Sequence, residues 1–328
     1  MPTLTLVQAE DIAAAALVRC RTAPDTARTV ARALVAAEAD GLKGHGLMRM
    51  PTYAAQARAR KVDGFAVPAA TRLRPGTALV DAANGFAFPA LALAERLLPE
   101  MANTCGIACA AITRSHHCGA AGHPVERLAD AGLVALMFAN TPAAIAPWGG
   151  AKALFGTNPI AFACPLAGGA PLVVDLSLSK VARGNILAAK QKGEAIPPGW
   201  ALDAEGRPTT DPAAALAGTM LPLGDAKGTA LALMVELLAA GLSGAHYAAQ
   251  ASSFLDTEGP PPGTGQLIIA IDAGAFGAAR ERFAGLAAAV MAEPGARLPG
   301  SRRLAARAAA QRDGFAVSAA LLAEIEAL

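Results

Sequence analysis

Residues 107–123 read Ile107-Ala108-Cys109-Ala110-Ala111-Ile112-Thr113-Arg114-Ser115-His116-His117-Cys118-Gly119-Ala120-Ala121-Gly122-His123. The stretch begins as a continuous apolar run and then enters a turn of small residues. Ligands bind at such strand ends in α/β sheets, because backbone amides converge there. The small side chains also let a flat ligand or a phosphate approach the backbone. The alternative is a tight packing turn whose histidines have no chemical role.

Similar short apolar runs alternate with helical stretches along the middle of the chain. We expect strands at 79–80, 107–112, 133–138, 160–163, 172–175 and 267–272, and a helix over 89–101. Continuous apolar runs flanked by helices indicate a sheet that is covered on both faces. The sequence therefore predicts an α/β fold.

The two ends of the chain have a different pattern. The first seventy residues are expected to be helical, with helices over 10–20 and 25–39, where Pro24 and Asp25 suit a first turn. Residues 61–68 break this pattern and are expected to form a connection. An apolar helix is expected within 221–242. The tail from Ala278 is again helical, with breaks at 294–295 and 298–300. We expect a helical segment over 1–70 that packs with 278–328, and an α/β domain over 71–277 that binds cofactor and substrate.

The composition excludes several classes of protein. The chain has 328 residues, of which 54% are hydrophobic and only 16% charged, as in a compact globular protein. A net charge of +2 and an aromatic content of 4% argue against a nucleic-acid partner. The most apolar stretch, 229–242, is too short to span a membrane and is interrupted by Glu236. The chain does not begin with a basic region followed by an apolar stretch, so we expect a cytoplasmic protein.

Five scattered cysteines do not form a disulfide pattern. The run His116-His117-Cys118 contains metal-binding side chains, but no second cluster completes a set of four ligands. We expect reduced, mostly buried thiols and no metal.

A histidine between two glycines is the best candidate for proton transfer. His45 lies in Gly44-His45-Gly46, so little side-chain bulk surrounds its imidazole, and Arg49 follows four residues later. On a helix the two side chains would share a face. Together they offer a group that titrates near neutrality and a permanent cation. The alternative is an ordinary surface pair at the start of a helix.

Other candidates lie in loops and at element ends. Residues 140–150 and 154–160 form a long loop pair between two apolar strands, which is either functional or a structural Pro/Gly loop. Asp175 ends an apolar run, where it can orient a histidine or cap a helix. Lys227 heads an apolar helix, where a cation is unfavourable unless it binds an anion. Arg302 and Arg303 are either further anion ligands or ordinary surface charges. The Gly-x-Gly-x-x-Gly, P-loop, His-Glu-x-x-His and Gly-x-Ser-x-Gly motifs are absent.

Taken together, these blocks resemble the malate/L-lactate/sulfolactate dehydrogenase family, whose cofactor-binding sheet is not a Rossmann fold. The resemblance covers roughly residues 6–322, and 156–162 is its most specific block. The matching blocks are Gly44-His45-Gly46 with Arg49 and Pro51-Thr52-Tyr53, then 115–122, 140–142, 146–150, 156–162, 174–175, 179–184 and 227–228. One departure concerns the residue before the catalytic histidine, which is usually serine in the family and is Gly44 here.

The resemblance implies a role for each matching residue. His45 is the expected proton donor and acceptor, with Asp175 as its charge partner, and Arg49 is expected to contact a cofactor phosphate or the substrate carboxylate. Substrate contacts are expected from Arg49, His117 and Thr157. Cofactor contacts are expected from His117, Gly119, Ala120, Ala121, Thr141, Leu176, Ser177, Lys227, Gly300, Ser301 and Arg302.

The resemblance also implies the reaction and the assembly. We expect a homodimeric oxidoreductase that prefers NADP(H), with NAD(H) possible, and transfers hydride to C2 of a small 2-oxo acid of the malate, lactate or sulfolactate type. An alternative is an NADPH-dependent cyclic imine reductase that acts on Δ1-piperideine-2-carboxylate or Δ1-pyrroline-2-carboxylate and forms pipecolate or proline. Imine reduction depends less on a serine-assisted relay, so Gly44 is compatible with it. A non-catalytic metabolite-binding protein is the remaining alternative.

Overall fold

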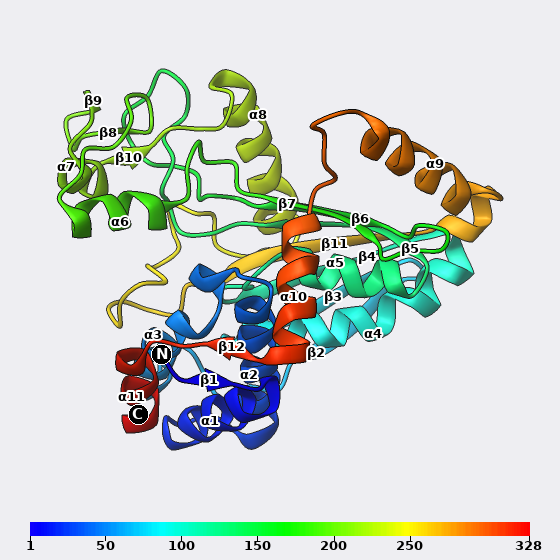
Figure 1. Ribbon diagram of the computed structural model, residues 1–328, viewed down its shortest axis with the longest axis horizontal. Coiled ribbons are helices and arrows are strands. Elements are labelled where there is room, and N and C mark those ends of the chain that lie inside the picture. Colours follow the sequence, from blue (N-terminus) through cyan, green and yellow to red (C-terminus); the bar gives the residue numbers. More distant parts are fainter.

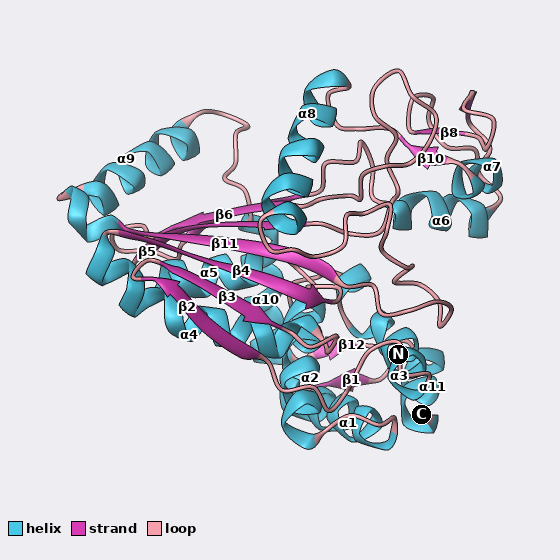
Figure 2. Ribbon diagram, turned by 180° about the vertical axis from the view of Figure 1, so that it is seen from behind, coloured by secondary structure: helices cyan, strands magenta, loops and turns pink.

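The computed structural model describes residues 1–328 and is built around one seven-stranded sheet (Figures 1 and 2). The strands are β2 Ala69–Arg74, β3 Thr77–Asp81, β4 Ile107–Ser115, β5 Leu133–Ala139, β6 Ile160–Cys164, β7 Leu172–Leu176 and β11 Thr264–Asp272. Their spatial order is β2-β3-β4-β11-β5-β6-β7. Only β3 and β4 pair in parallel, and the other neighbours are antiparallel. The expected α/β class with a mixed sheet is confirmed.

Helices cover the two faces of this sheet to different extents. α4 Ala87–Cys105 and α5 Gly122–Asp130 pack on one face over a core rich in alanine (Figure 1). On the other face lies α8 Ala226–Val235, which continues as a π-helix over Glu236–Gly241. Figure 2 shows that α8 crosses only part of this second face. The expectation of a sheet covered on both faces is therefore only partly met, and Ile107 remains 52% exposed.

The two ends of the chain meet in a helical unit beside the sheet. It contains α1 Leu6–Arg19, α2 Pro24–Ala39, α3 Met50–Arg58, α10 Ser301–Asp313 and α11 Ala319–Ala327. Two short strands, β1 Thr3–Leu4 and β12 Phe315–Ala316, pair antiparallel and join the termini. α10 contacts α2, and α11 contacts α1 and α3. α9 Ala279–Ala292 lies apart, at the far end of the sheet (Figure 1).

A small third unit follows β7 and leads back to α8. It contains α6 Arg183–Lys192, α7 Pro212–Ala217, β8 Ala201–Leu202, β9 Pro208–Thr209 and β10 Thr219–Met220. Its apolar core is separate from the others and includes Ile145, Ile186 and Met220. The entrance and exit of this unit meet where Ser179 forms a bridge with Pro222.

Most of the expected elements are present. All six predicted strands and the helix over 89–101 are confirmed, each at least one residue longer than expected, and the first two helices correspond to α1 and α2. The expectation of a helical segment up to residue 70 is wrong in two places. Residues 40–49 leave the α-helix, and β2 begins at Ala69. Every residue of β2 is exposed because it is an edge strand, so it lacks the apolar alternation that marks a buried strand.

None of the helices combines the length and the apolar character that crossing a membrane requires.

Candidate active site

His45 lies between α2 and α3 in two consecutive 3₁₀ turns, Lys43–His45 and Leu47–Arg49. The expectation that His45 and Arg49 share one helix is therefore wrong. The cause is the carboxylate of Glu38, which accepts the first N–H of the second turn at 3.0 Å and bends the chain. Arg49 nevertheless folds back toward His45, because its Nε donates to the Gly44 carbonyl at 2.7 Å.

The two glycines beside His45 have different surroundings. A Cβ atom on Gly46 would collide with the Glu38 carboxylate, so the bend requires glycine there. A Cβ atom on Gly44 would have no other atom within 4 Å. The departure at Gly44 therefore leaves open space next to His45.

The imidazole of His45 is largely enclosed but keeps one open side. Its Nδ1 atom is buried without a hydrogen-bond partner, whereas Nε2 reaches solvent and is also free of protein partners. Burial, reinforced by the positive charge of Arg49, lowers the pKa of His45 to about 4. His45 is therefore neutral near pH 7 in this state, with Nε2 free to exchange a proton with a bound molecule.

His117 lies directly beside His45. The two rings stack with centroids 5.4 Å apart and planes within 7°. The Nδ1 atom of His117 is hydrogen-bonded to the hydroxyl of Tyr53 at 2.5 Å, and its Nε2 reaches solvent. Burial lowers the pKa of His117 well below its usual value and raises the pKa of Tyr53. The structure thus brings together two neutral imidazoles, each with an accessible Nε2.

Asp175 lies at the end of β7, where its Oδ2 accepts the Gly122 N–H at 2.7 Å. The carboxylate is accessible to solvent, yet the protein around it raises the pKa of Asp175 through burial. Asp175 and His45 share no hydrogen bond in this structure, so their pairing stays a prediction.

Two of the turns expected to bind the cofactor lie near β7. Gly119 has φ +69°, and a Cβ atom there would lie 2.8 Å from the Phe88 ring, so the turn before α5 requires glycine. Gly300 has φ +81°, and an added Cβ would lie 3.5 Å from the Val173 carbonyl of β7. α5 and α10 therefore both begin beside β7. The Asp175 carboxylate accepts the first N–H of α5, whereas no side chain caps α10. The free N–H groups at the N-terminus of α10 favour an anionic ligand.

Other residues predicted to bind the cofactor lie in the same turns and element ends. Ala120 and Ala121 are buried in the turn before α5, Leu176 is exposed at the end of β7, and Ser301 and Arg302 are exposed in the first turn of α10. The anion expected for Arg303 turns out to be a carboxylate of the protein itself, Glu126.

Three hydroxyl residues from separate loops are joined by hydrogen bonds. The Thr157 N–H donates to Thr141 Oγ1 at 2.9 Å, and the two threonine hydroxyls are 3.3 Å apart. Ser177 Oγ donates to the Thr157 carbonyl at 3.3 Å. Lys227 lies in the first turn of α8, is exposed and forms no hydrogen bond with these residues. The structure therefore unites Thr141, Thr157 and Ser177, and Lys227 stays a prediction.

A buried carboxylate that the sequence did not single out supports these loops. Glu236 Oε1 accepts from Asn158 Nδ2 at 2.8 Å, and Oε2 accepts from Asn140 Nδ2 at 3.2 Å and from the Ala248 N–H at 3.0 Å. Neither asparagine can flip its amide, because backbone groups bind both ends of each one. Glu236 was noted only as an interruption of an apolar helix. That interruption was the available signal, since a lone acid in such a helix needs buried partners.

A second buried network lies behind His45. Asp40, which directly follows α2, accepts hydrogen bonds from His123 at 2.9 Å, Arg303 at 3.1 Å and Arg307 at 2.7 Å. Both arginines also pair with Glu126 of α5. The network fixes α10 to α5 and to the start of the His45 turns. No local pattern in the sequence connects these five residues.

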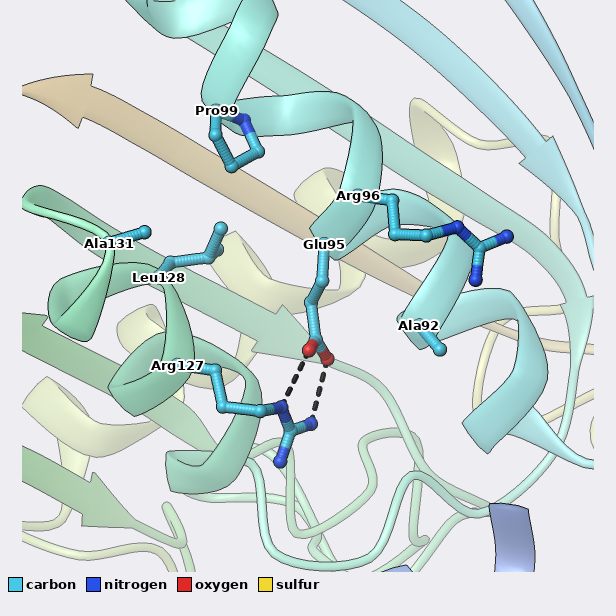
Figure 3. A pocket seen from close by; sticks show the side chains of 7 residues that line it. All are labelled: Ala92, Glu95, Arg96, Pro99, Arg127, Leu128 and Ala131. Carbon is cyan, nitrogen blue, oxygen red and sulfur yellow. Dashed lines mark hydrogen bonds and ion pairs between the residues drawn. The ribbon is translucent and has the colours of Figure 1, made fainter. Parts of the chain in front are cut away.

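The remaining chemistry-bearing residues show no further site. All five cysteines are free, and the structure contains no group of three or more His, Cys, Asp or Glu residues that could hold a metal ion. A hollow of about 340 Å³ lies between α4 and α5, where Arg127 pairs with Glu95 at 2.6 and 2.8 Å (Figure 3). None of the expected site residues lines it.

Comparisons with known proteins agree with this geometry. The sequence model of the malate/L-lactate dehydrogenase family matches residues 4–326. The chain belongs to this family. It is 54% identical to a (2R)-3-sulfolactate dehydrogenase (NADP(+)) of Chromohalobacter salexigens, over 93% of this chain and 91% of that protein. It is 44% identical to a Δ1-pyrroline-2-carboxylate/Δ1-piperideine-2-carboxylate reductase of Pseudomonas putida, over 89% of this chain and 86% of that protein.

Solved structures of the malate/L-lactate dehydrogenase family support the fold in the same way. The Δ1-piperideine-2-carboxylate reductase of Pseudomonas syringae superposes with a TM-score of 0.95 at 38% identity, and the match covers 100% of this chain and 99% of that one. The family consists of dehydrogenases and reductases in these comparisons, so this family member is an oxidoreductase.

Proposed function

We propose that this protein is an NADP(H)-dependent dehydrogenase that interconverts a 2-oxo acid and its 2-hydroxy acid, with sulfopyruvate and (2R)-3-sulfolactate as the pair. The observation that carries the proposal is the 54% identity, over 93% of the chain, to a (2R)-3-sulfolactate dehydrogenase (NADP(+)). The site described above supplies the chemistry that this reaction needs.

Arg49 supports a strongly anionic substrate. Its Nε donates a hydrogen bond to the Gly44 carbonyl, while Nη1 and Nη2 have no acceptor within the protein. A guanidinium with a free fork binds carboxylate or sulfonate oxygens through charge-assisted hydrogen bonds. The open space at Gly44 lies beside this cation and gives room for a bulky acidic group.

The chain's residues fit a dinucleotide. The uncapped start of α10 suits its phosphates, and the glycine-requiring turn at Gly119 lets a ligand approach the backbone. The exposed Arg302 at the start of α10 is our candidate for the additional phosphate of NADP(H). When bound, the nicotinamide supplies or accepts the hydride.

His45 is the proposed proton carrier. In the oxidation direction, neutral His45 accepts the hydroxyl proton at Nε2. In the reduction direction, the same atom donates a proton to the carbonyl oxygen while C2 gains a hydride. Binding of an anion beside His45 favours the protonated imidazole, which offsets the effect of burial on its pKa.

The test is a substrate panel with purified protein and either NADPH or NADH. Sulfopyruvate, oxaloacetate, pyruvate and Δ1-piperideine-2-carboxylate are compared by loss of reduced-cofactor absorbance. We expect the highest kcat/KM with sulfopyruvate and NADPH. Higher kcat/KM with the imine would replace the proposal by its alternative, and cofactor binding without any turnover would favour a metabolite-binding protein.

The role of His45 has a matched control. His45→Ala should lower kcat by about 100- to 10,000-fold, the usual contribution of general acid–base catalysis, while cofactor affinity is retained. His246→Ala is the control, because His246 is exposed and its side chain hydrogen-bonds only to the Pro262 carbonyl. A His45→Ala variant within a few-fold of wild type would exclude His45 as the proton carrier.

Cyclic imine reduction is the second candidate. It is favoured by the TM-score of 0.95 with the Pseudomonas syringae enzyme and by the 44% identity with the Pseudomonas putida enzyme. A neutral His45 is also compatible with an imine, which is already easily protonated.

We also propose that the protein is a homodimer that buries the apolar surface of α8. This helix and its π-helical extension expose Leu231, Leu233, Met234 and Leu237, between 37% and 53% each, beside a partly bare sheet face. Light scattering should give twice the monomer mass, and Leu237→Glu should reduce it to the monomer mass. Val7→Glu is the control on an exposed apolar residue of α1. A dimer that survives Leu233→Glu combined with Leu237→Glu would exclude this surface.

A cytoplasmic location is part of the same proposal. Its support is the presence of five free cysteines, of which Cys105 is exposed, as is usual in a reducing compartment.

A further inference from the structure

Tyr53 is a fully buried side chain whose hydroxyl has a single partner. The phenol oxygen lies 2.5 Å from His117 Nδ1 and forms no other hydrogen bond. The ring is packed against Phe86, Phe88 and His116, with centroids 5.5 to 6.3 Å away. The side chain therefore has no freedom to turn its hydroxyl elsewhere.

The direction of this hydrogen bond follows from burial. If His117 Nδ1 donated, the phenol proton would be left in a dry site without any acceptor, which costs about 1–3 kcal/mol. If the phenol donates, its proton is hydrogen-bonded to His117 Nδ1 and no buried proton lacks an acceptor. Burial also keeps the phenol protonated and the imidazole neutral, since it raises the pKa of Tyr53 and lowers that of His117. The phenol is therefore the donor and Nδ1 the acceptor.

A neutral imidazole that accepts at Nδ1 carries its proton on Nε2. The Nε2 atom of His117 reaches solvent, so it presents an N–H group to whatever binds there. The stacked ring of His45 differs, because its buried Nδ1 has no partner to select a tautomer. One imidazole is thus fixed and the other is free.

We propose that Tyr53 is a positioning residue that fixes His117 as a hydrogen-bond donor to the substrate and leaves proton transfer to His45. This inference rests on the proposed function for its substrate. A fixed N–H favours the carbonyl oxygen of a 2-oxo acid and opposes a protonated imine nitrogen, which is itself a donor. Tyr53 therefore contributes to the preference for 2-oxo acids over cyclic imines.

The tautomer is measured directly by nitrogen NMR on the full-length protein labelled with ¹⁵N-histidine, with NADPH bound. Signals of His117 are identified by their loss in His117→Gln. We expect Nε2 to be protonated and Nδ1 to be unprotonated at pH 7. A proton on Nδ1 would overturn the inference whatever the substrate is, so this result is independent of the proposed function.

The kinetic test uses the two tyrosines of the chain as a matched pair. Tyr53→Phe removes only the hydroxyl, and Tyr247→Phe does the same at an exposed position. Tyr53→Phe should lower kcat/KM for sulfopyruvate by up to about 10-fold, as for loss of a hydrogen bond between neutral groups. It should lower kcat/KM for Δ1-piperideine-2-carboxylate less, and it should give mixed tautomer signals for His117.

Equal losses with both substrates would show a merely structural role and overturn the inference. The same holds if Tyr53→Phe behaves like Tyr247→Phe. If wild type reduces neither substrate, the proposed function fails, while the tautomer measurement on the wild-type protein still decides the inference. The tautomer measurement uses the wild-type protein, so it remains decisive even if Tyr53→Phe does not fold.

Discussion

Replacement of Asp40 by asparagine should destabilise the protein far more than an ordinary loss of a carboxylate. The side chain is completely buried and accepts hydrogen bonds from His123, Arg303 and Arg307. In the wild type, two arginines balance Asp40 and Glu126. Asp40→Asn leaves one positive charge without compensation and places an amide N–H₂ against donor groups.

The size of the effect follows from the burial of the partners. Removing one partner of a buried ion pair usually costs about 3–5 kcal/mol. Arg303 is 12% exposed and Arg307 is 29% exposed, so solvent screens part of the uncompensated charge. We therefore expect the free energy of unfolding to fall by about 3 kcal/mol, at the lower end of that range.

The assay is denaturant unfolding at pH 7 with linear extrapolation. Asp11→Asn is the matched control, because Asp11 pairs with Arg28 at 2.7 Å but the two side chains are 59% and 40% exposed. That variant should lose about 1 kcal/mol or less. If Asp40→Asn loses no more than Asp11→Asn, the network does not stabilise the fold in the way argued here.

The stability difference between wild type and Asp40→Asn should also depend on pH in a predictable direction. Burial opposes ionisation of Asp40, but hydrogen bonds from Arg307 and His123 outweigh it and hold the pKa of Asp40 well below its usual value. A depressed carboxyl pKa contributes stability that is present above the unfolded value, about 3.9, and lost as the pH falls toward the folded value. The stability difference between wild type and Asp40→Asn should therefore be constant from pH 8 to 5 and shrink below about pH 4. A difference that grows on acidification would contradict this sign.

Three further predictions test other parts of the site. Glu236→Gln should lower the free energy of unfolding by about 2–4 kcal/mol and raise the substrate KM. The reason is that the new amide N–H₂ group would face the buried donors that Glu236 now accepts from. An unchanged free energy of unfolding and an unchanged KM would show that Glu236 does not support the loops of Thr141 and Thr157. Gly44→Ser should change the free energy of unfolding by less than about 0.5 kcal/mol, since its Cβ has open space, and a larger loss in the same assay would show that the space is not available. For the free enzyme, kcat/KM for oxidation of the hydroxy acid should rise through about pH 4 as His45 loses its proton and should then stay level. A transition near pH 6.5 that disappears in His45→Asn would refute the low pKa.

The sequence predicted the sheet better than the segments around it. Strands such as β4 and β5 carry continuous apolar runs because one face is buried and most of the other face is at least partly buried, and these runs mark their positions. β2 has no buried residue and so leaves no such mark. The turns at His45 were also outside the reach of periodicity, because the helix is ended there by the Glu38 carboxylate, a contact across nine residues.

In the site, too, residues marked by local sequence patterns were predicted, whereas residues that act across long separations in the sequence were not. Flanking glycines, strand ends and family blocks led to the prediction of His45, His117, Asp175 and the start of α10 as site residues. The groups that orient these residues were not identified, because each acts over a long separation in the sequence. Tyr53 reaches His117 across 64 residues, and Arg307 reaches Asp40 across 267 residues.

The Asp40 network links parts of the site that the sequence treats as unrelated. Asp40 begins the segment that bends into the His45 turns, and Arg303 and Arg307 lie on the helix that starts with Ser301 and Arg302. Both arginines also bind Glu126 of α5. The first N–H of α5 donates a hydrogen bond to Asp175. A displacement of α10 must therefore move the candidate phosphate ligands and the His45 turns together. For this reason Asp40→Asn should raise the KM for NADPH and lower kcat in the same variant, although Asp40 forms no hydrogen bond with His45 or His117.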